Sequence, residues 1–479
     1  TIAGHYTKDI TALGPRISRT RTGLPRIIPA NHRTLIRKGN PFVIKYYLTI
    51  FSMYRNIIIP YKLKIQTITA PFSGNVRIFE VLGKYIPSFT RLFARPDLLL
   101  KDNDNNNKSF NFRWNPKSTF ESIYEIPKED LSLATKYLSK YFMYFPVNKS
   151  SPNTLGRGEV STSIRAMLRS LWNLSLNKEQ GTALITVLDR VNPNRDLARF
   201  MYNFYKNYIK RQVKIPAWLA IRPYLGKLGL KGEAAGKMRV FAMVDPITQW
   251  ALAPLHKFLF RILSKHIMDG TFDQLKPIGR AWMHKALYSL DLSAATDRLP
   301  MQLQKALLVD LFKDKQFVDS WATLLVSRPY QVPRNKYTTL TEVYYAVGQP
   351  MGALSSWAML AYTHHFIVQC AAWKSGITSK TKLYRDYAVL GDDIVIFNKT
   401  VALEYLNIIK LLGVECGLAK SVLSPKGIGL EFAKKTFYKG NNVSPTPLLE
   451  FSEALLNWTT FKQYCLMYKL SFAKAIRVS

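Results

Sequence analysis

Short apolar runs, broken by glycine, proline and small polar residues, mark where strands and helices should form. Tyr387–Leu390 and Ile394–Phe397 flank a Gly-Asp-Asp tip and predict a tight β-hairpin, since glycine at the first position of a two-residue turn permits a positive φ. Ala286–Leu292 predicts another strand, which ends around Asp291. After Pro300, a helix is predicted by an apolar stripe at Leu303, Leu307, Leu308 and Leu311. The pattern therefore brings acidic residues to the ends of two predicted strands.

Further segments complete this outline. Gly352–Trp373 has no charged residue, but its Ser, Thr, His and Gln side chains are costly in hydrocarbon, so it predicts a buried helix instead of a membrane span. Gly226–Met243 predicts a glycine-rich loop that leads into a strand at Met238–Val244. Helices are also predicted at 42–56, 401–412 and over most of 448–476, with a linker at 439–447.

The composition indicates a folded protein with a large positive charge. Of the 479 residues, 47% are apolar and 13% aromatic, while 68 Lys and Arg against 31 acids give a net charge of +37. Such a charge favours a polyanionic partner, and nucleic acid is the usual one. In residues 1–70 aromatic side chains interleave with the basic ones, so this segment is expected to contact RNA; a solvated basic surface is the alternative.

The cysteines and the N-terminal residues of the sequence indicate in which cellular compartment the protein is expected. Cys370, Cys416 and Cys465 are far apart and match no disulfide or zinc spacing, so a reducing compartment or the mitochondrial matrix fits better than secretion. The chain begins at Thr1 without methionine, so we expect a processed chain or a fragment, and no secretory signal is visible at this end.

The acidic strand ends predict a metal site. Asp392 and Asp393 repel each other at the hairpin tip unless a cation neutralises them, and oxygen ligands of this kind suit Mg²⁺. Asp291 ends a different strand, and two metal ions about 4 Å apart need carboxylates from more than one strand. Alone, Asp291 would be an ordinary helix-entry residue; together with the hairpin, it favours two-metal phosphoryl transfer.

Two cations precede this site in the sequence. The stretch around them is not a P-loop, because its glycine spacing is one residue short and Met238 stands where Ser or Thr should bind Mg²⁺. Alternation along a strand instead puts Lys237 and Arg239 on the same side. There they could hold a triphosphate, or they could be solvated charges on an edge strand.

A glycine turn at Gly348–Ser356 leads into the uncharged helix. Gly352 gives the backbone freedom to bend, and Ser355 and Ser356 add hydroxyls at the helix start. A mobile turn of this kind suits an enzyme that moves along a template, and helix capping is the alternative.

With these motifs assembled, the chain resembles a viral RNA-dependent RNA polymerase, most closely those of mitoviruses. The matching stretches, in order, are EAAGKMRVFAMVD, DLSAATDRLP, GQPMGALSSWAMLAYTHH, VLGDDIVIF, and KSVLSPKG followed by EFAKK. They run from about residue 220 to 440, and the basic N-terminal segment is also similar to the family. Five motifs in this order are far more specific than Gly-Asp-Asp alone.

The resemblance implies an α+β fold of the right-hand polymerase type, with fingers, a palm made of an antiparallel sheet flanked by helices, and a short helical thumb. Residues 1–150 would form the basic N-terminal extension and fingers elements, 151–285 the fingers and 286–440 the palm. Residues 441–479 would form the thumb, which we expect to be truncated.

The resemblance also implies roles for individual residues. Asp291 and Asp392 would bind two Mg²⁺ or Mn²⁺ ions with Asp393 in support, and Lys420 falls where such polymerases carry a candidate general acid for pyrophosphate. The residues expected at the nucleotide are Lys237, Arg239, Thr296, Asp297, Gly352, Ser355 and Ser356. The implied partners are an RNA template, its product and ribonucleoside triphosphates. No obligate protein partner is inferred, and the implied location is mitochondrial.

The sequence also departs from the wider viral pattern and leaves alternatives open. Thr296 stands where many viral polymerases have a second aspartate, and His364 and His365 occur where many have asparagine in the helix after the glycine turn. A reverse transcriptase or maturase is disfavoured because Leu390 is not aromatic and Asp291 is followed by small residues. A non-catalytic RNA-binding remnant of a polymerase is the alternative from another class.

Overall fold

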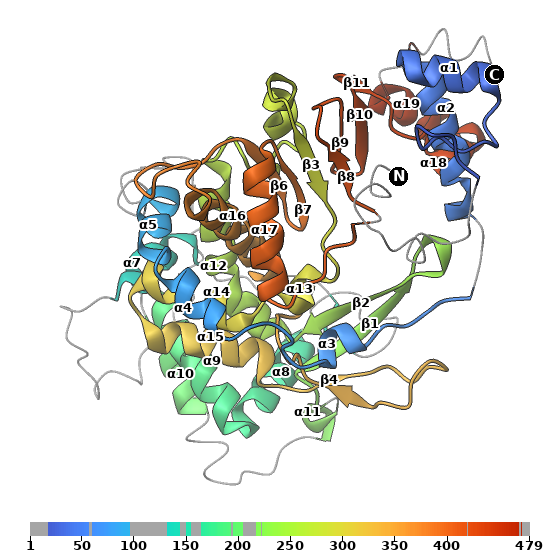
Figure 1. Cartoon of the computed structure of the whole chain (residues 1–479). Coiled ribbons are helices and arrows are strands. Elements are labelled where there is room, and N and C mark those ends of the chain that lie inside the picture. Colours follow the sequence, from blue (N-terminus) through green and yellow to red (C-terminus); the bar gives the residue numbers. More distant parts are fainter. Residues whose placement is uncertain are drawn as a thin grey trace.

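An antiparallel four-stranded sheet carries the acidic hairpin. The computed structural model describes residues 18–56, 60–95, 132–143, 150–154, 164–192, 195–204, 217–221, 223–418, 420–468 and 471. In spatial order, the strands of this sheet are β6 (Tyr387–Leu390), β7 (Asp393–Ile396), β3 (Leu287–Leu290) and β8 (Val422–Ser424). The predicted hairpin and the strand before Asp291 are therefore confirmed, and they lie side by side (Figure 1).

The two faces of this sheet pack against different partners because side chains alternate along each strand. Val389 and Ile394 belong to the main apolar core, which includes residues of α16 (Ser356–Lys374) and α17 (Lys399–Leu411). Ala388 and Val395 point the other way and pack with residues of the 3₁₀ helix η8 (Lys276–Met283) and of β9 (Gly429–Phe432). The sheet is thus covered by helices on one face, as predicted for the palm of an α+β polymerase fold.

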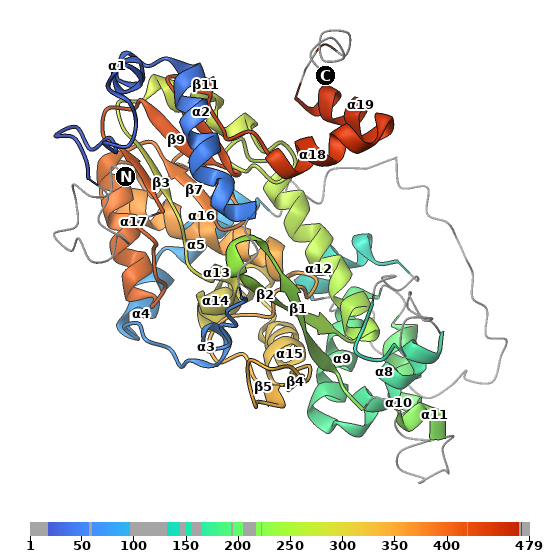
Figure 2. The same ribbon diagram turned by 90° about the vertical axis from the view of Figure 1, so that its right-hand side faces the viewer.

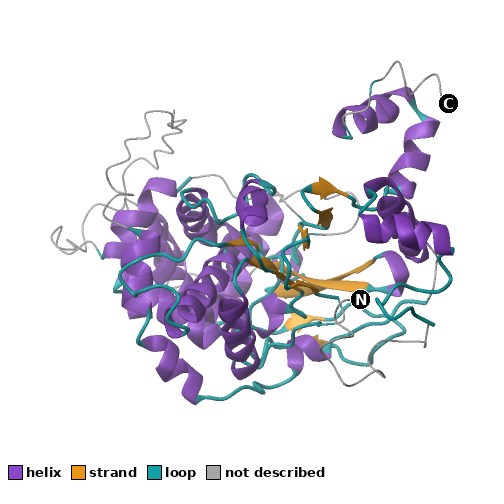
Figure 3. Cartoon of the chain, turned by 45° about the horizontal axis from the view of Figure 1, so that its top comes forward, coloured by secondary structure: helices purple, strands orange, loops and turns teal. Residues whose placement is uncertain are grey.

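The remaining helices pack mainly to one side of the strands (Figure 3). α16 is buried over nearly its whole length, as its uncharged sequence predicts, and the leucine stripe after Pro300 is buried in α14. Pro300 itself is the N-cap residue of α14. The longer helices of this layer are α8 (Ile164–Leu176), α9 (Lys178–Val191), α10 (Asp196–Phe204), α12 (Pro246–Ser264), α14 (Met301–Phe312) and α15 (Lys315–Val326). Short helices join them at α3 (Gln66–Thr69), α4 (Arg77–Gly83), α5 (Ile86–Phe89), α7 (Leu133–Leu138), α11 (Ala217–Ala220) and α13 (Ala295–Arg298).

One prediction about this region is wrong: the glycine-rich stretch before Met238 is a strand, not a loop. β1 (Gly226–Gly232) pairs over its full length with β2 (Met238–Val244), whose predicted bounds are confirmed. Glycine is required in this strand because aromatic rings pack directly over its backbone. An added Cβ on Gly229 would lie only 2.3 Å from the ring of Phe241. The hairpin continues through β4 (Tyr330–Gln331) and β5 (Glu342–Val343) into a second sheet.

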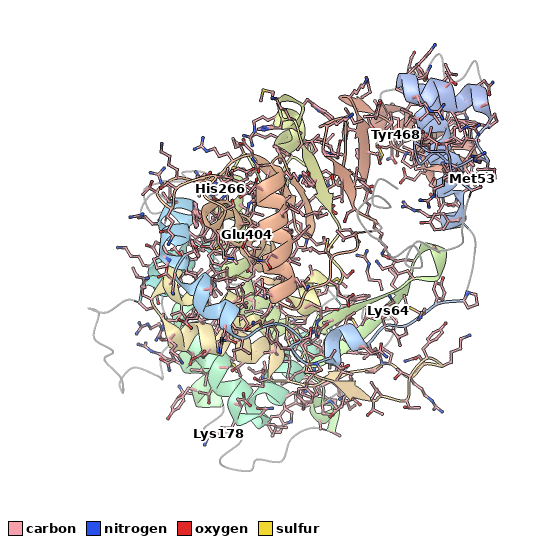
Figure 4. The ribbon with its side chains drawn as sticks, viewed as in Figure 1. Met53, Lys64, Lys178, His266, Glu404 and Tyr468 are labelled. Atoms are coloured by element: carbon pink, nitrogen blue, oxygen red, sulfur yellow. The ribbon has the colours of Figure 1, made fainter. Side chains whose placement is uncertain are left out.

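The N-terminal and C-terminal helices lie at the same end of the molecule in Figure 1. They are α1 (Ala30–Lys38), α2 (Pro41–Ser52), α18 (Leu448–Leu456) and α19 (Trp458–Met467). The backbone N–H of Thr446 donates to the Thr49 hydroxyl at 2.9 Å, which joins the two ends. The predicted linker at 439–447 contains the short strand β11 (Asn441–Asn442), which pairs with β10 (Lys435–Tyr438). Tyr468 and Lys178 mark opposite ends of the molecule in Figure 4.

The terminal helices leave large apolar side chains exposed. α18 and α19 pack on each other (Figure 2). The side chains of Leu456, Trp458 and Leu466 remain exposed on them. Within the described residues, none of the helices combines the length and the apolar character that a bilayer crossing would need.

Candidate active site

Strand pairing brings the predicted carboxylates to one edge of the first sheet. Leu290 of β3 is paired with Ile394 of β7, so Asp291, the next residue along, lies opposite Asp393, the first residue of β7. Both continue the face that turns toward β9, because side chains on a strand repeat every two residues. Asp392 is exposed at the tip of the hairpin, after Gly391 with a φ of +62°.

The carboxylates at this edge act on one another electrostatically. Burial, together with the neighbouring charges of Asp392, Asp291 and Glu431, raises the pKa of Asp393 to about 6, although Lys434 opposes the shift. Burial is also the main reason that the pKa of Asp291 is raised, and Asp392 adds to it. Acids held this close favour a bound cation, which would relieve their repulsion.

A fourth carboxylate, Glu431 of β9, belongs to the same group. Burial raises its pKa, the charge of Asp291 raises it further, and Arg55 opposes the shift. The Ser289 hydroxyl, on β3 two residues before Asp291, accepts the backbone N–H of Glu431 at 2.9 Å and so fixes β9 beside β3. The EFAKK stretch includes Glu431 but predicted no role for it, because the proximity of this residue to Asp291 depends on how β9 packs on the sheet.

These side chains fit divalent metal ions in their chemistry, since carboxylate oxygens are what Mg²⁺ and Mn²⁺ prefer. In the described part of the chain, no three acidic, histidine or cysteine side chains converge as a ready-made metal cage. The residues that would hold the ions are Asp291 and Asp392, with Asp393 beside them.

A loop after α17 holds Asp291 by its backbone. The N–H of Asp291 donates to the Ser421 hydroxyl at 3.1 Å, and its carbonyl accepts the N–H of Gly417 at 2.7 Å. Gly417 allows this close approach, since an added Cβ would lie 3.1 Å from Asp291 Oδ2. The same loop brings the exposed Lys420 near Asp291, and its charge partly offsets the raised pKa of that carboxyl, which burial causes. Ser421 and Gly417 were not predicted from the sequence.

Lys237, directly before β2, and Arg239, within β2, point to the same side, as alternation predicts. The evidence is that both side chains contact the carboxylate of Glu233. The Arg239 Nε atom is 2.5 Å from one oxygen of Glu233, and Lys237 Nζ is 3.8 Å from the other. The side chain of Lys237 is 69% exposed and that of Arg239 is 44% exposed, so both are accessible to an anion from solvent. Lys237 is also close enough to Asp291 to lower the pKa of that carboxyl, against the larger effect of burial.

The structure places the glycine turn against β2 and does not bring its serines to the carboxylates. Gly352 has a φ of +116°, and an added Cβ would lie 2.4 Å from the Ala242 carbonyl oxygen. The Ser355 hydroxyl is buried and accepts the indole N–H of Trp321 at 3.0 Å, and Ser356 is buried as well. In this conformation, Ser355 therefore holds the start of α16 in place.

Thr296 and Asp297 of α13 form hydrogen bonds with the glycine turn at Gly348–Ser356 and with Thr67 of α3. Their carbonyl oxygens accept the backbone N–H groups of Gln349 and Gly348 at 3.0 and 2.9 Å. The Thr67 hydroxyl donates to Asp297 Oδ2 at 2.8 Å. Burial raises the pKa of Asp297 to about 6, although Thr67 and Arg298 oppose the shift.

The stability of the chain should therefore depend on the charge of Asp297. Between about pH 4 and pH 6, the folded state keeps a proton that the unfolded state has lost, so stability falls as the pH rises and stays lower above that window. We expect Asp297→Asn, which keeps an acceptor for Thr67, to unfold a few degrees higher than wild type at pH 7.5. Thermal unfolding at pH 7.5 and pH 4 checks this; an equal difference at both pH values would contradict it.

The fold and this edge define a class of protein: an α+β chain with neighbouring carboxylates at a strand end and a hairpin tip, faced by exposed cations. The sequence profile described as mitovirus RNA-dependent RNA polymerase matches residues 136–477. The chain therefore belongs to the mitovirus RNA-dependent RNA polymerase family.

Individual relatives agree with this assignment. The chain is 41% identical to an RNA-directed RNA polymerase of Cryphonectria parasitica mitovirus 1, over 55% of this chain and 32% of that protein. It is 35% identical to an uncharacterized mitochondrial protein of Arabidopsis thaliana, over 46% of this chain and 87% of that protein. The match thus spans about a third of the length of the viral polymerase. Among solved structures, an insertion-loop deletion mutant of the polymerase of a human picobirnavirus aligns over 45% of each chain with 19% identity and a TM-score of 0.33.

Proposed function

We propose that this chain synthesises RNA on an RNA template by two-metal nucleotidyl transfer. The observation that carries the proposal is the placement of Asp291 and the Asp392–Asp393 pair on adjacent strand ends, within a chain of this family. The net charge of +37 suits the RNA template and product. The similarity to viral polymerases and to a mitochondrial protein supports a mitochondrial location.

In this proposal, the 3′-hydroxyl of the growing strand attacks the α-phosphate of a ribonucleoside triphosphate. The hydroxyl oxygen forms a P–O bond to the α-phosphate and gives up its proton to water, and the P–O bond between the α-phosphate and the leaving pyrophosphate breaks. Asp291 and Asp392 would hold the metal ions, and such ions would stabilise the charge on the attacking and leaving oxygens. Lys420 donates a proton to the departing pyrophosphate, and Lys237 and Arg239 bind the triphosphate.

The direct test is primer extension by the purified chain on an RNA template with four ribonucleotides and Mg²⁺ or Mn²⁺. We expect template-directed products with ribonucleotides and much less product with deoxyribonucleotides. Efficient use of deoxyribonucleotides would favour a reverse transcriptase. RNA binding without any synthesis would instead favour the non-catalytic RNA-binding remnant.

Alanine at Lys237 or Arg239 should weaken the use of nucleotides. Each loses a charged contact to phosphate, so we expect kcat/KM for the nucleotide to fall roughly ten- to hundredfold, with little change in template affinity. Lys305→Ala is the control for the loss of a surface cation, because Lys305 lies on α14 instead of the hairpin and pairs with Asp319. Steady-state extension and RNA-binding titrations check this; a defect confined to RNA binding would assign the two cations to the template path.

Sugar selection is proposed to depend on Asp297, or on Thr296, because only small residues follow Asp291 closely. A lost hydrogen bond to the 2′-hydroxyl costs about 1–3 kcal/mol, or roughly a ten- to hundredfold loss of preference for ribonucleotides. The measurement compares ribonucleotide and 2′-deoxynucleotide incorporation by wild type, Thr296→Ala and Asp297→Ala. If both variants discriminate as strongly as wild type, neither residue contacts the sugar.

A further inference from the structure

A buried histidine joins the acidic turn to the helices beneath it. His364 lies on α16 and is fully buried. Its Nδ1 atom is 2.8 Å from the carbonyl oxygen of Gly391, and its Nε2 atom is 2.6 Å from the hydroxyl of Tyr405 on α17. The sequence shows this histidine in place of the asparagine of many viral polymerases, but its burial beneath the turn removes it from any contact with a nucleotide.

The chemistry of the three groups fixes the direction of both hydrogen bonds. A carbonyl oxygen can only accept, so Nδ1 of His364 must carry the proton and donate to Gly391. In the neutral ring, Nε2 then carries a lone pair, and this lone pair accepts a hydrogen bond from the hydroxyl of Tyr405. Tyr405 is fully buried too. Burial lowers the pKa of His364 to about 4, so the ring is neutral near pH 7.

This contact bears on Asp392 through the planarity of the peptide bond. The carbonyl of Gly391 and the N–H of Asp392 belong to one rigid unit, so fixing the carbonyl also fixes the plane from which Asp392 projects. On another side the turn meets Trp357, because a Cβ on Gly391 would lie 2.8 Å from its indole nitrogen. The carboxylate of Asp392 is exposed, but the backbone before it is fixed by the contacts of Gly391 with His364 and Trp357.

We propose that His364 and Tyr405 are positioning residues that orient Asp392 for metal binding. This inference rests on the proposed function, and it adds two side chains that touch neither nucleotide nor metal. The hydroxyl of Tyr405 donates to Nε2 and holds the imidazole ring in place, and the ring in turn holds the carbonyl of Gly391. Groups that orient metal ligands in this way typically change metal affinity or activity by about 10- to 100-fold when removed.

The neighbouring residue provides a matched control. His365 is on the same helix and equally buried, but it contacts the Tyr387 hydroxyl at 2.7 Å and Asp269 Oδ2 at 3.0 Å. His365→Phe therefore removes the same ring at the same depth without touching the Gly391 carbonyl. His364→Asn serves as the conservative variant, because it keeps an N–H donor attached at Cγ, as Nδ1 is.

The experiment measures Mn²⁺ binding to the free protein by electron paramagnetic resonance, together with RNA affinity and the kcat and KM of extension. We expect His364→Phe to weaken Mn²⁺ binding and to lower kcat by about tenfold or more, with RNA affinity and nucleotide KM within about twofold of wild type. His364→Asn should recover much of the Mn²⁺ affinity. Tyr405→Phe should show a smaller loss in the same direction.

Equal Mn²⁺ affinity for His364→Phe and His365→Phe would overturn the inference, and so would a wild-type chain that binds no Mn²⁺. If His364→Phe does not fold, Tyr405→Phe decides, since it removes a single oxygen atom and keeps the ring; unchanged Mn²⁺ affinity in that variant would overturn the inference. Failure of the proposed function is a different result: no synthesis by wild type, with Mn²⁺ affinity still dependent on His364.

Discussion

Asp392→Asn should abolish RNA synthesis while leaving RNA binding nearly unchanged. The side chain is exposed at the hairpin tip, so the substitution removes a charge from the proposed metal site without disturbing the packing of the sheet. Metal ions stabilise the charge that develops at transferring phosphoryl groups by several kcal/mol. Losing about 4 kcal/mol of this stabilisation slows the reaction by about a thousandfold. Single-turnover primer extension, with RNA affinity measured at the same salt concentration, checks the result.

Asp319→Asn is the control for the change of charge. Asp319 lies on α15, where its carboxylate pairs with Lys305 and Lys315 at the surface. This variant should synthesise RNA at the wild-type rate. Comparable extension by Asp392→Asn and wild type would end the catalytic interpretation of the hairpin, whatever the family of the chain.

The strands and turns around the candidate site could be predicted from the sequence because local residue patterns define them. Alternation placed Lys237 and Arg239 on one side, and the structure confirms this through their shared partner, Glu233. The hairpin turn at Gly391 and the strand before Asp291 are likewise set by residues close in sequence. Local rules succeed where neighbouring residues decide the backbone.

The remaining features depend on contacts between distant segments. Gly226–Gly232 looked like a loop because glycine is rare in strands, yet aromatic rings packed over it make glycine necessary there. The hydroxyl of Ser355 was expected near the nucleotide, but it bonds Trp321, 34 residues away in sequence. Glu431 joins the carboxylates only through the packing of β9, which no periodicity reveals.

A buried ion pair at the end of the β1–β2 hairpin is another contact between distant segments. Arg328 and Asp245 are both fully buried and hydrogen-bonded to each other. Asp245 follows β2 and caps α12, where its Oδ1 accepts the N–H of Thr248 at 2.9 Å. Arg328 also donates to Gln180 of α9 at 2.6 Å through its Nη2 atom. The pair therefore ties the strand that carries Arg239 to the helical layer.

Arg328→Leu should be among the most destabilising single substitutions in the chain. It leaves the Asp245 carboxylate buried without its cation, and breaking a buried pair in this way costs about 3–5 kcal/mol. Asp245→Asn should cost a similar amount, because it keeps the helix cap but strands the Arg328 charge. Since neither charge is left buried alone in Asp245→Asn/Arg328→Leu, the double variant should lose clearly less stability than the sum of the two single losses. Urea unfolding of wild type and the three variants checks this, with Lys305→Leu on the exposed face of α14 as the surface control; strictly additive losses would show that the two charges do not depend on each other.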